Sequence, residues 1–170
     1  MEYEFGQMVD AAAVQQTTGA EIADSTFRDN RRWVVAADNV FAVLQHLRDV
    51  HGFDMLVDIT AVDYLETQDA ADRYGVVYPL LNTETGERLI VKTFVNDPDP
   101  EVPTVTPLWR GADWMEREVY DMFGIRFRGH PDPRRILMPD EFTEFPLRKD
   151  YPLKGRGERH NFPVITRAES

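Results

Sequence analysis

The chain has 170 residues, enough for one domain with a hydrophobic core, and it carries a formal net charge of −11. It contains no cysteine, which excludes disulfides and thiolate ligands for zinc or iron–sulfur clusters. No apolar run approaches the roughly 18 residues of a membrane span, and the acidic balance opposes binding to nucleic acid.

Hydrophobic periodicity predicts an alternation of helices and strands over the first hundred residues. Gly19 and Gly52 are predicted to end two helices, and Asp38 to cap the second. Pro79 is expected at a sheet edge or a bulge, since it has no N–H to donate. In chain order, we expect a helix at 7–18, a hairpin from strands 22–28 and 31–36, a helix at 38–51, a strand at 55–64, and a hairpin from strands 74–82 and 88–95.

A further helix is predicted over residues 113–122, after a loop at 96–107 that contains four prolines. Asp113 and Glu116 have the spacing of a capping box, and Gly124 is expected to end the helix. Its core-facing side is predicted to carry Met115, Val119 and Met122.

The other side of this helix carries Arg117, Glu118 and Asp121. Arg117 and Asp121 are four residues apart and can form an ion pair worth about 0.3 kcal/mol. The two carboxylates either remain in water or meet arginines of the C-terminal residues or of another chain.

Residues 126–170 form what we call the C-terminal strip, which is rich in proline, basic and aromatic residues and is expected to have no regular element. Residues 1–125 carry 9 Lys and Arg against 23 Asp and Glu, whereas residues 126–160 carry 9 against 6. We therefore expect an acidic body at 1–125 and an extended strip at 126–170 that binds a partner. The fold class is α+β in two layers, with helices on one face of a mixed, mostly antiparallel sheet in the order α-β-β-α-β-β-β-α.

Motifs for independent chemistry are weak or absent in the sequence. There is no GxGxxG after a strand, no P-loop and no cysteine nucleophile. Asp58 and Asp63 lie five apart on opposite faces of a regular strand, which disfavours a metal site. His130, near Asp132, is expected to be a structural hydrogen-bonding residue. A stand-alone metal enzyme that uses Glu118, Asp121 and His130 remains a remote alternative.

The residues from Glu116 onward nevertheless have a recognisable order and spacing. The runs from Glu116 to Ile125, from Phe127 to Leu137, and from Pro146 to Pro152, with Pro139-Asp140 between them, resemble the 30 kDa subunit family of NADH-quinone oxidoreductase, the respiratory complex I. The residues around Phe142 and Phe145 depart from the usual pattern. The signature positions carried over are Glu116, Arg117, Glu118, Asp121, Gly124, His130, Asp132, Arg134, Arg135, Pro139, Arg148, Lys149, Asp150 and Tyr151.

The resemblance implies a non-catalytic structural subunit in the hydrophilic arm of a proton-translocating complex, whose partners are chiefly the quinone-site subunit and neighbouring subunits of that arm. It implies no catalytic, cofactor or metal residue in this chain, with FMN and iron–sulfur clusters in partner subunits. It also implies a peripheral location at the cytoplasmic side of the cell membrane, reached through the complex. The equivalent subunit of a membrane-bound hydrogenase or of a ferredoxin-driven quinone reductase is the alternative.

Overall fold

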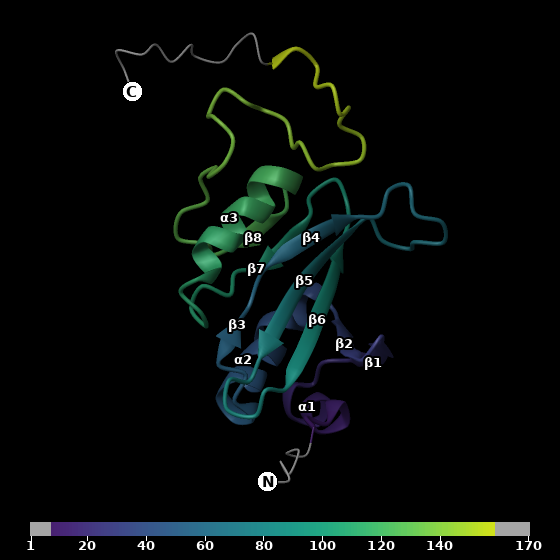
Figure 1. Ribbon diagram of the computed structural model, residues 1–170, viewed down its shortest axis with the longest axis vertical. Coiled ribbons are helices and arrows are strands. Elements are labelled where there is room, and N and C mark those ends of the chain that lie inside the picture. Colours follow the sequence, from purple (N-terminus) through teal and green to yellow (C-terminus); the bar gives the residue numbers. More distant parts are fainter. Residues whose placement is uncertain (1–7, 159–170) are drawn as a thin grey trace.

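The computed structural model describes residues 8–158 and confirms the α+β class. Six strands form a mixed sheet in the order β1-β2-β6-β5-β3, and β4 also pairs with β5 (Figure 1). In this sheet β2 and β6 run parallel, and the other pairs are antiparallel. The elements are α1 (Ala11–Thr18), β1 (Ile22–Phe27), β2 (Asn30–Val35), the 3₁₀ turn η1 (Ala37–Asn39), α2 (Val40–His51), β3 (Met55–Leu56), β4 (Thr60–Asp63), β5 (Tyr74–Leu81), β6 (Arg88–Val95), β7 (Glu101–Pro103), α3 (Ala112–Phe123) and β8 (Arg126–Arg128).

The helix ends follow the glycines, as predicted, but the second helix begins differently. Gly19 and Gly52 both have left-handed backbones, with φ of 69° and 71°, and they end α1 and α2. Asp38 does not cap α2, because it lies inside η1. The N-cap is Asn39, whose side chain makes no capping bond.

The predicted strand at 55–64 is broken into β3 and β4, which pair in turn with β5. Leu56 lies opposite Leu80, and Thr60 lies opposite Val77. The three residues 57–59 between β3 and β4 therefore face only two residues of β5, 78 and 79. Pro79 lies at this irregularity, and its carbonyl accepts the N–H of Val57 at 2.9 Å. The proline therefore sits in an inner strand at a bulge-like break, where its missing N–H costs no ladder bond.

Two short strands were not predicted. β7 and β8 pair in parallel and extend the loop after β6 toward the start of the C-terminal strip. Phe127 of β8 and Val102 of β7 are buried in the core. The expectation that the strip has no regular element is therefore wrong at its first residues, and the predicted boundary at residue 125 falls inside packed structure.

The core lies between one face of the main sheet and the helices. α2 contributes Val40, Val43, Leu44 and Leu47, and α3 contributes Val119, Met122 and Phe123. The predicted core side of α3 is confirmed, with Met115 packed against its edge. α3 packs on β4, and the strip crosses the end of α3 that leads into β8 (Figure 1). This arrangement brings the signature residues together around α3.

Candidate functional site

Glu116 is buried on the inner side of α3 and does not form a capping box. The N-cap of α3 is Gly111, with no side-chain bond, so the predicted cap by Asp113 is wrong. The Glu116 side chain is fully buried. Its Oε1 accepts the N–H of Val105 at 2.6 Å, and its Oε2 lies 2.6 Å from the Thr104 hydroxyl. The carboxyl therefore ties α3 to the residues that follow β7.

The surroundings of Glu116 favour its protonated form. Burial raises its pKa to about 7, against the smaller opposing effect of the bonds from Thr104 and Val105. A protonated Oε2 can donate to the Thr104 hydroxyl, which can in turn donate to the Thr106 hydroxyl 3.0 Å away. The three groups then form a chain in which each oxygen has a partner.

His130 lies beside this carboxyl. Its Nδ1 accepts the N–H of Asp132 at 3.0 Å, so the proton of the neutral ring is on Nε2, which donates to the Asp113 carbonyl at 3.1 Å. The Nε2 is also 3.8 Å from Glu116 Oε2. His130 is thus a hydrogen-bonding residue that fixes the turn between β8 and the rest of the strip.

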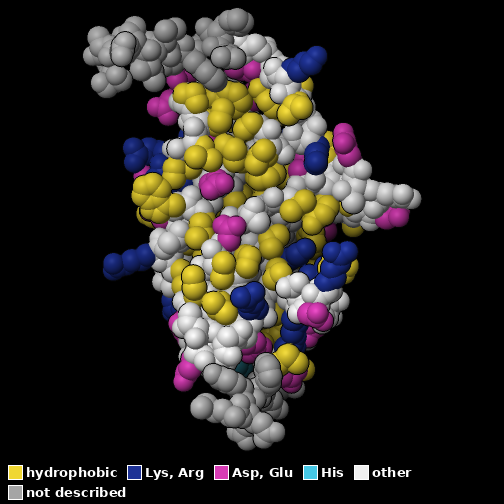
Figure 2. All heavy atoms as spheres, viewed as in Figure 1, with side chains coloured by type: hydrophobic (Ala, Val, Ile, Leu, Met, Phe, Trp, Pro, Cys, Tyr) yellow, Lys and Arg dark blue, Asp and Glu magenta, His cyan; other side chains and the backbone are white. Residues whose placement is uncertain are grey.

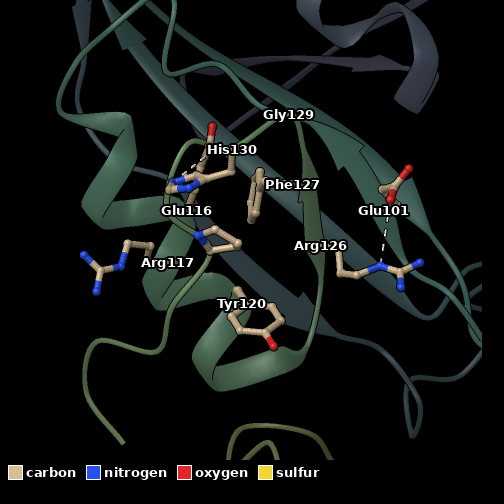
Figure 3. A pocket seen from close by; sticks show the side chains of 9 residues that line it. Glu101, Glu116, Arg117, Tyr120, Arg126, Phe127, Gly129 and His130 are labelled. Carbon is tan, nitrogen blue, oxygen red and sulfur yellow. Dashed lines mark ion pairs between the residues drawn. The ribbon is translucent and has the colours of Figure 1, made fainter. Parts of the chain in front are cut away.

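Glu116 and His130 lie at one end of a cavity of about 370 Å³ between α3, β8 and the turn at 129–133 (Figure 3). Figure 3 shows Tyr120 of α3 at the opposite end, and the ion pair of Glu101 with Arg126 along the side. The charged groups that line the cavity therefore already have partners within the chain.

We expect the pH dependence of stability to identify Glu116 as a buried, protonatable group. Its pKa is raised in the folded chain, so its stabilising contribution is complete below the ordinary value of 4.5 and is lost as pH rises through about 7. Across this window the loss amounts to roughly 3 kcal/mol. Glu116→Gln keeps an acceptor for Val105 and a donor for Thr104, and it should remove this pH dependence.

The measurement is urea unfolding of the wild-type chain and the variants at pH 5 and pH 8. Glu118→Gln is the matched control, because Glu118 is an exposed carboxylate on the same helix. An unchanged pH dependence in Glu116→Gln would show that Glu116 is ionised throughout this range.

Asp121 holds the strip against the outer side of α3. The Asp121 side chain is fully buried, and its Oδ1 accepts from Arg135 Nη1 at 2.6 Å. Its Oδ2 accepts from three successive backbone N–H groups, those of residues 136, 137 and 138, at 3.1, 2.7 and 2.8 Å. Burial would raise its pKa, but these N–H groups and Arg135 together hold the pKa below its ordinary value.

Two arginines complete this contact, although not in the predicted pairing. Arg117 does not bond Asp121. It donates to the carbonyls of Arg134 and Arg135, at 2.9 and 3.0 Å, while Arg135 also donates to the Glu144 carbonyl at 3.2 Å. The strip is therefore held by its backbone as well as by its side chains.

The end of α3 is closed by the second half of the strip. Arg148 Nε donates to the Phe123 carbonyl at 2.6 Å, and the N–H of Leu147 donates to the Met122 carbonyl at 3.1 Å. These bonds satisfy carbonyls that a helix end otherwise leaves without partners. Gly124 ends α3 as predicted, with φ of 77°, and the ring of Phe145 lies where a side chain at this position would project.

Gly124→Ala should therefore cost more than an ordinary glycine replacement. An added Cβ would lie 2.6 Å from the Phe145 ring, so the ring would have to move. The left-handed backbone at this position would also be strained by any side chain. Gly19→Ala is the matched control, since Gly19 ends α1 with φ of 69° and no atom lies within 4 Å of its added Cβ.

We expect a loss of about 1–2 kcal/mol for Gly19→Ala and about 2–5 kcal/mol for Gly124→Ala, measured by urea unfolding. Phe145→Ala in the Gly124→Ala background should recover the part due to the ring. Equal losses for the two glycine variants would contradict the close packing of Phe145.

Comparison with known proteins places this arrangement in a family. The model of the family described as "Respiratory-chain NADH dehydrogenase, 30 Kd subunit" matches residues 33–157 of this chain. An NADH-quinone oxidoreductase subunit from Trichlorobacter lovleyi is 46% identical over 132 residues, covering 76% of this chain and 80% of that protein. The equivalent protein of Citrifermentans bemidjiense is 48% identical over 121 residues, covering 71% and 73%.

The chain belongs to the respiratory-chain NADH dehydrogenase 30 kDa subunit family. The predicted resemblance is thereby confirmed, and other subunits of NADH-quinone oxidoreductase are its partners as a member of this family.

Two solved structures share the fold of this 30 kDa family member. A trypsin-resistant fragment (1-134) of Nqo5 is 37% identical, with a TM-score of 0.62, and covers 71% of this chain and 95% of that one. A chain of the membrane-bound sulfane sulfur reductase, an archaeal respiratory membrane complex, is 26% identical, with a TM-score of 0.71, and covers 92% and 91%. Within residues 8–158 no helix is both long and apolar enough to cross a membrane.

The remaining signature positions of the 30 kDa family member lie on the surface or bind other parts of the chain. Asp132 pairs with Arg134 at 2.7 Å and lies 3.8 Å from Arg117. The Pro139 carbonyl accepts the N–H of Phe142 at 2.9 Å, and the ring of Tyr151 packs edge-on against Phe142 at 5.9 Å. Glu118 is exposed.

A second buried carboxylate was missed as a partner of the strip. Asp63 of β4 accepts the N–H of Lys149 at 2.8 Å and the guanidinium of Arg73 at 3.3 Å. Arg73 also pairs with Asp150 at 2.8 Å and with Asp97. Asp63 shares the inward side of β4 with Ala61, and this alternation was the available signal for a buried carboxylate that needs a cation.

Proposed function

We propose that this chain is a non-catalytic structural subunit of a proton-translocating NADH-quinone oxidoreductase, in the hydrophilic arm and in contact with the quinone-site subunit. FMN and iron–sulfur clusters would be held by the partner subunits, and the chain would lie at the cytoplasmic side of the membrane through those partners.

The proposal rests on the hydrogen bonds and ion pairs that the signature side chains form. Asp121, Arg117, Arg135 and Arg148 all bond to groups of the same chain, and they attach the strip to α3. Among the described residues, no three of His, Cys, Asp and Glu are grouped to hold a metal ion. The signature side chains therefore hold the strip on α3, and this use of them favours a structural role for the chain.

The attached strip presents a surface to partners. Its exposed side chains include Arg134, Leu137, Leu147 and Lys149, which mix apolar and basic character. Such a surface fits an apolar partner that carries acidic groups or carbonyls. Partner binding through the strip thus stays a proposal, alongside its observed packing on α3.

The alternative is the equivalent subunit of another membrane-bound redox complex. The sulfane sulfur reductase chain shares the fold over most of this chain, which keeps this alternative open. Its identity of 26% is lower than the 42–48% of the NADH-quinone oxidoreductase relatives, and this difference favours the NADH-linked complex.

The proposal predicts that the purified chain neither oxidises NADH nor absorbs visible light, whereas a tagged chain copurifies NADH-oxidising subunits from detergent-solubilised membranes. The measurements are NADH oxidation with an artificial acceptor, absorbance, and identification of the copurified proteins by mass spectrometry. A stoichiometric flavin on the single polypeptide would overturn the structural role. Copurified hydrogenase subunits would favour the alternative complex.

A further inference from the structure

The main sheet has one face that no described helix covers. α2 packs on the face that carries Trp33, Val76 and Val91, which are fully buried. The opposite face, which we call the open sheet face, is populated by outward-pointing apolar side chains, and Figure 2 shows them as a hydrophobic band over β4, β5 and β6. Its apolar members are Val34, Met55, Val57, Val62, Val77, Pro79, Leu81, Ile90 and Phe94.

The strand sequences differ from those of a sheet with one face in water. Such strands usually alternate apolar and polar residues, whereas strands covered on both faces are almost continuously apolar. β5 reads YGVVYPLL and contains no charged residue, and β6 reads RLIVKTFV with Ile90 and Phe94 facing outward. The composition of β5 is therefore that of a strand covered on both faces, whereas the outward side of β6 alternates Ile90 and Phe94 with Arg88 and Lys92.

Two hollows interrupt this face. One, of about 350 Å³, is lined by Met55, Val57, Pro79 and Ile90 among others. The other, of about 340 Å³, lies toward the opposite ends of the strands and includes Phe94. The lining of both hollows is mostly apolar, although Arg88 lines the first and Glu21 and Asp72 line the second. Hollows of this kind beside an apolar band can receive side chains of a bound protein.

Arg32 and Lys92 also lie on this face, as does Arg88 at the start of β6. The pairing of Val34 with Lys92 and of Arg32 with Ile90 places Lys92 and Arg32 diagonally on this face. Within residues 8–158 neither forms an ion pair, and Arg32 Nε is buried without a hydrogen-bond partner. Arg32 lies over the Phe27 ring, at 5.0 Å. Burial, and then the charge of Arg32, lower the pKa of Lys92.

We propose that the open sheet face binds another protein subunit of the complex, through an apolar surface that presents at least one carboxylate to Lys92 and Arg32. A carboxylate there would relieve the repulsion between these two cations, which no ion pair within residues 8–158 compensates. The net charge of −11 disfavours an anionic bilayer as the occupant of this face. This surface is separate from the strip, so it adds a second docking site to the proposed function.

The test is Lys92→Glu in the full chain, expressed with a tag in its own host. Arg110→Glu is the matched control, because this replacement makes the same change in net charge. Arg110 is exposed and lies in the loop before α3. Lys92→Arg keeps the charge and should keep binding. The readouts are the amount of each copurified subunit and urea unfolding of each purified chain.

We expect Lys92→Glu to reduce at least one copurified subunit about tenfold or more, with Arg110→Glu and Lys92→Arg unchanged. In the purified chain, Lys92→Glu should be as stable as wild type or more stable, because it replaces a repulsion with Arg32 by an attraction.

Copurification equal to wild type in Lys92→Glu would overturn the inference while leaving the proposed function intact. Loss of every subunit from the wild-type chain would instead overturn the proposed function. Light scattering that shows a wild-type dimer and a Lys92→Glu monomer would assign this face to a second copy. Binding of wild type, but not of Lys92→Glu, to phosphatidylglycerol vesicles would assign it to the membrane. Either result would overturn the inference.

Discussion

Replacing Asp121 by Ala is expected to lower the free energy of unfolding by about 3–5 kcal/mol, because the replacement leaves a partly buried guanidinium and three backbone N–H groups without their acceptor. Asp121→Asn keeps the shape, but it loses the charge opposite Arg135 and turns an amide N–H₂ toward groups that are themselves donors. It should therefore recover only part of the loss. Urea unfolding at pH 7 gives both values.

The pH dependence distinguishes this carboxylate from Glu116. The pKa of Asp121 is lowered in the folded chain, so its contribution is present above the ordinary value of 3.8 and is lost as pH falls through the folded pKa. Asp121→Asn should flatten the acid side of the stability profile. Glu118→Gln is again the exposed control. A loss below 1 kcal/mol in Asp121→Ala would contradict a strip held by this carboxylate.

Truncation after Gly129 is expected to lower the melting temperature by about 10 °C or more. It removes Arg135, Arg148 and the N–H groups that bind Asp121, together with the buried ring of Phe142. The smaller ordering cost of the shorter chain offsets part of this loss. Differential scanning calorimetry of the full and truncated chains measures the difference.

Truncation after Glu158 keeps the contacts among residues 8–158 and is the matched control. The sequence alone predicted an acidic body at residues 1–125, with the strip bound to a partner rather than to that body. The structure instead indicates that truncation near Gly129 weakens this body, because the strip closes the end of α3 and supplies the cation for Asp121. At this chain length, a loss of about 1 kcal/mol in the free energy of unfolding lowers the melting temperature by about 2–4 °C. A truncated chain that melts within about 2–3 °C of the full chain would therefore show that the strip contributes little to the fold.

Local signals in the sequence were sufficient to predict the structure where a single residue determines the backbone conformation. Gly19, Gly52 and Gly124 each require a left-handed φ, and each ends a helix as predicted. The two hairpins also follow their patterns. The caps failed at Asp38 and Asp113, because the residues before α2 and α3 have helical rather than extended backbones and leave no room for a side-chain cap.

Long-range contacts decided the rest. The predicted pair of Arg117 and Asp121 is worth a few tenths of a kcal/mol on an exposed helix. It cannot compete with one guanidinium and three N–H groups that reach Asp121 from residues 14–17 positions further on. β7 and β8 are three residues each, and two prolines near β7 concealed a strand whose partner is 25 residues away. No local pattern carries that information.

The most direct test of the structural role of the signature is the activity of assembled complexes that contain Asp121→Asn or Asp121→Ala. The measurement is NADH:quinone oxidoreduction, divided by the amount of assembled complex on native gels. If the role is structural, the amount of complex falls while the activity per complex remains that of wild type. Complexes assembled in normal amount but without activity would contradict it and assign Asp121 a direct part in the reaction.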